Sequence, residues 1–161
     1  MLTLRLNLAV IAGEDAGDTP YEDVGELAGI EDRQRIKGYI TRAMRSSSKE
    51  DAIGACYKED ISNSLFDVIE AAVLKRYPKV GLYAGFGVNA RSLEGQILKQ
   101  VMLEGVEQGI VVLPVHDAVA VTQDNADWAK EAILRAWFKH ANSRGSVARS
   151  RVKVDYPVTN Y

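Results

Sequence analysis

One His-Asp pair, His116-Asp117, stands between two short apolar runs, and its residue types and spacing permit metal chemistry. The flanking runs are rich in Val and Ile, which favours strands over a helix. The pattern therefore predicts a β-hairpin with His116-Asp117 at or near its turn, on a mostly buried support. A carboxylate beside apolar neighbours needs a partner or a cation. Two interpretations stay open: Asp117 bonds backbone amides in a tight turn, or its oxygen atoms bind Mg²⁺.

A second candidate site lies on the helix expected over residues 31–45. Arg33 and Lys37 are four positions apart and therefore share one face of that helix. Two cations at this spacing can clamp a polyphosphate, and the plainer alternative is a basic face in contact with water. The opposite face carries an apolar stripe that is typical of a core-facing helix.

Residues 113–119, Leu-Pro-Val-His-Asp-Ala-Val, resemble the palm-domain His-Asp motif of single-subunit nucleic-acid polymerases. This group comprises the bacterial family A DNA polymerases and the phage-type RNA polymerases. The resemblance implies that Asp117 is a ligand of catalytic Mg²⁺ or Mn²⁺ and that His116 positions the primer end. It also implies that Arg33 and Lys37 hold the incoming nucleoside triphosphate, because they fit the family's Arg-x-x-x-Lys helix.

Two segments depart from the family pattern. Residues 44–48 read Met-Arg-Ser-Ser-Ser where the family continues toward an aromatic residue and Tyr-Gly. This departure affects how the chain would recognise the base and the sugar of the incoming nucleotide. Residues 89–95 resemble the family segment in which an Asn precedes an apolar-Gln-Gly step, and this implies that Glu94 lies at the nucleic acid. Glu94 replaces the family Gln, and an acid there repels phosphate unless it pairs with Arg or a metal.

The family needs a second metal-binding Asp, and this sequence does not contain it at the matching place. Residues 4–9, Leu-Arg-Leu-Asn-Leu-Ala, resemble the segment just after that Asp, which would then precede Met1. Two-metal phosphoryl transfer needs anions that hold both ions about 4 Å apart. An upstream segment or a partner protein would supply the second acid, or the domain does not catalyse. Glu14, Asp15 and Asp18 are candidate substitutes, and loop solvation is their plainer explanation.

The expected fold is an α+β, palm-like single domain over residues 1–161. A small antiparallel sheet, made by the hairpin and a C-terminal strand over 151–156, carries helices packed on one face. Residues 31–77 form a fingers-like helical part. Residues 1–12 alternate and suggest a strand, although their Leu and Ala content allows a helix. Further helices are expected over residues 21–27, 60–77, 92–108 and 124–140.

Composition sets further limits on function. The net charge of −2 over 161 residues gives no global sign of nucleic-acid binding. A local basic tail is nevertheless expected to bind DNA or RNA, and its members are Arg144, Arg149, Arg151 and Lys153. The single cysteine, Cys56, excludes a disulfide framework and a thiolate metal site. No signal peptide or membrane-spanning run is evident, so we expect a cytoplasmic protein without a membrane partner.

The sequence thus predicts a polymerase-like nucleotidyltransferase domain or fragment of the plasmid- or phage-encoded kind, with one metal-binding Asp missing. Two alternatives remain. One is a non-catalytic nucleic-acid-binding or replication-complex module, and the other is an interaction domain in which His116-Asp117 is only a turn.

Overall fold

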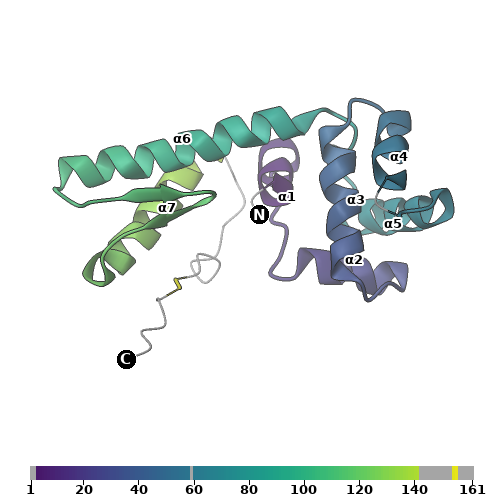
Figure 1. Cartoon of the computed structure of the whole chain (residues 1–161), viewed down its shortest axis with the longest axis horizontal. Helices are drawn as coiled ribbons and strands as arrows, with labels where there is room; N and C mark the ends of the chain where they lie inside the picture. The colour runs from purple at the N-terminus through teal and green to yellow at the C-terminus, as the bar shows by residue number, and fades with distance from the viewer. Residues whose placement is uncertain (1–2, 59, 142–153, 156–161) are drawn as a thin grey trace.

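The computed structural model describes residues 3–58, 60–141 and 154–155 (Figure 1). This described part contains seven α-helices, two short helical turns and one two-stranded hairpin. In chain order they are α1 (Thr3–Asn7), the π-helical turn η1 (Leu8–Ala12), α2 (Pro20–Ala28), α3 (Arg33–Arg45), α4 (Lys49–Tyr57), α5 (Asn63–Arg76), α6 (Phe86–Glu107), β1 (Leu113–Val115), β2 (Ala118–Ala120), the 3₁₀ turn η2 (Gln123–Asn125) and α7 (Ala126–Ala141).

The fold is mostly helical, and the expectation of a palm-like α+β domain is wrong. The N-terminal segment explains part of the error, because its alternating apolar residues form a helix. Leu4 and Leu8 pack into one buried cluster, whereas Leu6 packs into another. Burial on two sides of a helix produced the pattern that was interpreted as a strand. The expected C-terminal strand lies outside the described residues, except for Val154 and Asp155, which are in no strand.

The buried side chains form two clusters that meet at the N-terminal segment. The first cluster joins α2, α3, α4 and α5, and the second joins α6, α7 and one face of the hairpin. Figure 1 shows α6 as a long rod, with α3, α4 and α5 near one end and α7 and the hairpin near the other. Because α1 and η1 contribute to both clusters, this short segment links the two halves.

Helix ends follow local capping chemistry, and some expected bounds were wrong. The Asp32 carboxylate accepts hydrogen bonds from the first-turn amides of α3, and Ser62 caps α5 in the same way. Helix α4 was not expected. Helix α6 begins at Phe86, before the expected start at Ser92, because Gly85 adopts a φ of 61° that ends the preceding loop.

No helix in the described part is long and apolar enough to cross a membrane.

Asn7 is the one polar residue among the fully buried side chains of the described part. Its amide Nδ2 donates to the Gly81 carbonyl at 3.1 Å, and its Oδ1 accepts from the Gly81 N–H at 2.9 Å. Both backbone polar groups of the half-buried Gly81 are therefore satisfied by one side chain. This pairing fixes α1 to the loop that leads into α6.

Replacing Asn7 by alanine should lower the free energy of unfolding by about 2–4 kcal/mol, because two backbone groups of Gly81 lose their partners. Urea unfolding measures the effect. Asn89→Ala, at an exposed position of α6, is the control and should change stability by less than about 0.5 kcal/mol. Equal stability of the two variants would contradict a linking role for Asn7.

Candidate functional site

The predicted hairpin is present, and His116-Asp117 forms its two-residue turn. Strands β1 and β2 are antiparallel, with Val115 opposite Ala118 and Leu113 opposite Ala120. Both turn residues are exposed. The expectation of a mostly buried support is wrong, because Leu113 is 59% and Val115 is 50% exposed. The hairpin packs on the protein through its other face, where Val112 and Val119 join the second cluster.

The end of α6 determines where the hairpin goes. Gly109 adopts a φ of 68°, its N–H donates to the Val106 carbonyl, and the Ile110 N–H donates to the Gly105 carbonyl at 2.8 Å. This pair of bonds is a Schellman motif, which stops the helix and reverses the chain. The hairpin then runs back along α6, as Figure 1 shows.

Close packing holds the reversed chain against α6. A Cβ atom on Gly105 would lie 2.5 Å from Val112 Cγ2, 3.0 Å from the Ile110 carbonyl oxygen and 3.3 Å from the Trp128 ring. The absence of a side chain at residue 105 therefore lets the first residues after α6 and the start of α7 meet on its surface.

Glu94 on α6 senses charges from other elements of the fold, including the turn of the hairpin. Partial burial raises the pKa of the Glu94 carboxyl above its usual value, and the negative charge of Asp117 raises it further. Arg45 and Arg91 act in the opposite direction. Two predicted site residues, Glu94 and Asp117, therefore interact electrostatically, and Glu94 also senses two arginines that the sequence analysis did not single out.

The two arginines reach this place from different helices. Arg91 precedes Glu94 by three residues on α6, so the two side chains share a face. Arg45 ends α3, and its stem lies on Gly87 at the start of α6, where an added Cβ would come within 2.4 Å of Arg45 Cγ. Arg91 could have been identified from its spacing to Glu94. Arg45 could not, because only the packing of α3 on α6 brings it there.

Arg33 and Lys37 lie elsewhere on α3. Arg33 Nε forms an ion pair of 2.5 Å with Glu22 on α2, and its guanidinium lies over the Tyr21 ring. Arg33 and Arg45 are the first and last residues of α3, about 18 Å apart along its axis. The end that meets α6 is the Arg45 end. The structure therefore does not bring Arg33 to the hairpin turn. Lys37 lies one helical turn after Arg33 on α3, still nearer the Arg33 end than the Arg45 end.

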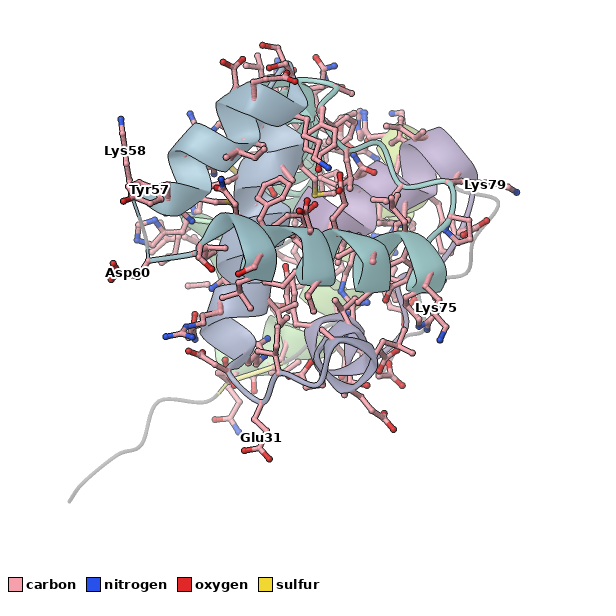
Figure 2. The ribbon with its side chains drawn as sticks, turned by 90° about the vertical axis from the view of Figure 1, so that its right-hand side faces the viewer. Glu31, Tyr57, Lys58, Asp60, Lys75 and Lys79 are labelled. Atoms are coloured by element: carbon pink, nitrogen blue, oxygen red, sulfur yellow. The ribbon has the colours of Figure 1, made fainter. Side chains whose placement is uncertain are left out.

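A hollow of about 460 Å³ adjoins Arg33, at the surface of α2. Its charged lining is mainly acidic, and Glu31, one of the lining residues, points outward in Figure 2. This lining does not suit a triphosphate, because carboxylates repel phosphate. The contacts of Arg33 are those of an exposed surface pair.

The remaining candidates contribute little to the site. Arg144, Arg149, Arg151 and Lys153 lie outside the described residues. The acidic loop between η1 and α2 makes local contacts: Glu14 pairs with Lys79, and Asp15 accepts from the Gly17 N–H. Among residues 3–58, 60–141 and 154–155, no group of three or more His, Cys, Asp or Glu could hold a metal ion. Two neighbouring carboxylates fit one Mg²⁺ that keeps several waters, and they do not fit a two-ion centre.

Comparison with protein-family models, curated proteins and solved structures finds no match to this chain. The resemblance to single-subunit polymerases therefore stays a prediction from short motifs.

Gly105→Ala should push the hairpin off α6 and lower the free energy of unfolding by about 1–3 kcal/mol. The matched control is Gly95→Ala, because a Cβ at this exposed position of the same helix meets nothing within 4 Å. The control should raise stability by about 0.5–1 kcal/mol, the usual gain from removing a helical glycine. Urea unfolding separates the two, and a stabilised Gly105→Ala would contradict the packing described.

The raised pKa of Glu94 predicts a pH-dependent stability. The folded state holds this proton more tightly than the unfolded chain, so ionisation of Glu94 costs stability as the pH rises above about 4.5. Glu94→Gln should therefore gain stability relative to the wild type between pH 4.5 and 7. Thermal unfolding at a series of pH values measures this. Asp117→Asn should lower the pKa of Glu94 in an NMR titration, and an unchanged pKa would show that the two side chains are not neighbours.

Proposed function

We propose that this chain is part of a metal-dependent, polymerase-like nucleotidyltransferase that acts on nucleic acid with a nucleoside triphosphate. Asp117 is the ligand to Mg²⁺ or Mn²⁺, and His116 lies beside the primer end. The observation that carries the proposal is the hairpin turn, which presents His116 and Asp117 at exposed positions. The proposal does not depend on a palm-like sheet.

The backbone of His116 supports a role for its side chain. His116 has a φ of 54°, in the left-handed region, and it is the first residue of a two-residue hairpin turn. Glycine is usual where such a turn needs a positive φ. A histidine there costs stability, and strained positions of this kind cluster at functional sites. This backbone conformation supports the proposed role of His116, and His116→Gly would relieve the strain.

The carboxylate pair defines what the chain itself can do. A bound Mg²⁺ would stabilise the charge on a transferring phosphoryl group. Asp117 and Glu94 would hold one such ion, and the exposed turn leaves room for its waters and for phosphate oxygens. A second ion needs a further acid, which would have to come from outside the described residues.

A second candidate function is a nucleic-acid-binding module without catalysis. It is favoured by the small number of acids at the described site, since two carboxylates alone do not make a two-ion centre. The basic tail, Arg144, Arg149, Arg151 and Lys153, would then supply the affinity, which should fall steeply with salt.

The purified chain should bind Mn²⁺ weakly through Asp117 and should not extend a primer with nucleotides and Mg²⁺. One carboxylate pair offsets only part of the cost of dehydrating the ion, and the ion that activates the primer hydroxyl lacks its anchor. Water-proton relaxation measures Mn²⁺ binding, and a primer-extension assay measures activity. Asp117→Asn should abolish the Mn²⁺ signal, whereas Asp124→Asn, an exposed acid at the other end of β2, should preserve it.

The outcomes separate the two functions. Loss of Mn²⁺ binding in Asp117→Asn supports the nucleotidyltransferase. Equal Mn²⁺ binding by the wild type and Asp117→Asn, together with salt-sensitive binding of an oligonucleotide, supports the non-catalytic module. Robust extension by the wild type that is lost in Asp117→Asn would show that an acid in this chain replaces the missing one, and Glu94 would be mutated first.

A further inference from the structure

We propose that the hollow at the end of α2 binds a basic peptide by receiving one of its arginine or lysine side chains. The hollow has a volume of about 460 Å³, and its lining comes from α2, the loop after it and the first residue of α3. This binding site is independent of Asp117 and of the proposed nucleotidyltransferase.

The hollow exists because of the way α2 ends. Gly29 adopts a φ of 67°, its N–H donates to the Glu26 carbonyl, and the Ile30 N–H donates to the Gly25 carbonyl at 2.9 Å. These bonds reverse the chain. A Cβ atom on Gly25 would lie 2.6 Å from the Ile30 carbonyl oxygen, whereas a Cβ atom on Gly29 would meet nothing within 4 Å. The reversed chain is therefore packed tightly at Gly25 and leaves open space beside Gly29.

A guanidinium group already lies at the wall of this hollow. The guanidinium carbon of Arg33 is 5.0 Å from the centre of the Tyr21 ring, and Arg33 Nε is 2.5 Å from Glu22 Oε1. An aromatic face and a carboxylate each attract a cation. The protein's own side chain thus shows the kind of group that this surface holds.

The lining has more carboxylates than this one guanidinium neutralises. Glu22, Glu26 and Glu31 all line the hollow, and Arg33 is the one cation among the lining residues. Glu22 pairs with Arg33, whereas the Glu26 and Glu31 side chains form no ion pair or hydrogen bond with another described residue. Glu31 extends outward, as Figure 2 shows. Charge complementarity therefore selects a second cation as the occupant.

The apolar and exposed character of the lining indicates where that cation comes from. Tyr21 and Ile30 supply apolar surface, which suits the methylene stem of an arginine or lysine. Most of the lining residues are exposed, so the hollow covers its occupant from one side, whereas small-molecule pockets enclose most of their ligand. A side chain presented by a peptide needs no such enclosure.

The test is fluorescence anisotropy, at low salt, with a labelled peptide in which arginine alternates with glycine. Glu26→Gln and Glu31→Gln should each weaken binding about two- to fivefold, the range for one exposed ion pair, and the double variant about tenfold. The control, Glu50→Gln/Glu107→Gln, removes two exposed acids from α4 and α6 and should bind as the wild type does. The same peptide with uncharged citrulline in place of arginine should not bind.

Two arginines of α3 give a second matched comparison. Arg33→Gln frees Glu22 and the Tyr21 ring for the peptide, so binding should tighten about two- to fivefold. Arg35 pairs with Asp32 at 3.4 Å and does not line the hollow. Arg35→Gln removes the same charge without freeing the hollow, so it should tighten binding less. Equal gains in the two variants would mean unspecific attraction and would overturn the proposal.

An NMR titration locates the peptide on the protein. The amide signals of Gly29 and Ile30 should shift, and those of the hairpin turn should not. Shifts confined to another surface, no binding by the wild type, or an equal loss in the control with acids removed elsewhere would each overturn the proposal. Free arginine amide binding as tightly as the peptide would overturn the peptide as the occupant. Thermal unfolding checks that the variants are folded, as expected for exposed positions.

Discussion

The arrangement of the two halves depends on one buried pairing, between the Asn7 side chain and the backbone of Gly81. A buried side-chain amide must find hydrogen-bond partners, and Gly81 provides both a donor and an acceptor. Gly81 lies a few residues before α6, so the pairing fixes where that helix starts relative to α1. The position of α6 in turn places Glu94, Arg91 and the hairpin.

A second set of contacts holds the same loop to the first cluster. Tyr83 adopts a φ of 58°, its N–H donates to the Ala43 carbonyl, and its hydroxyl donates to Glu70. Its hydroxyl also contacts that of Tyr39, at 3.0 Å. Burial raises the pKa of both tyrosine hydroxyls above the usual value, which is itself well above neutral pH. The end of α3, where Arg45 lies, is thereby held beside the start of α6.

Sequence patterns predicted the local features well and the long-range ones poorly. The helix around Ile36 and the hairpin around His116 were found because helix periodicity and Val-rich runs are local signals. The strand expected over residues 1–12 failed because its alternating leucines are divided between two cores, which no local pattern reveals. Glu94 was singled out by resemblance, whereas Arg45 depends on α3 meeting α6 at Gly87. Such a contact follows from tertiary packing and has no signature in either helix alone.

Pro114 gives the two sides of the hairpin different properties. It lies opposite Val119 in the ladder, and because proline has no N–H, this pair cannot exchange hydrogen bonds. The N–H and carbonyl of Val119 therefore point away from β1, toward the open side of β2. On the β1 side the matching donor is missing. An added strand is consequently disfavoured beside β1, where proline removes one of the hydrogen-bond donors of the edge.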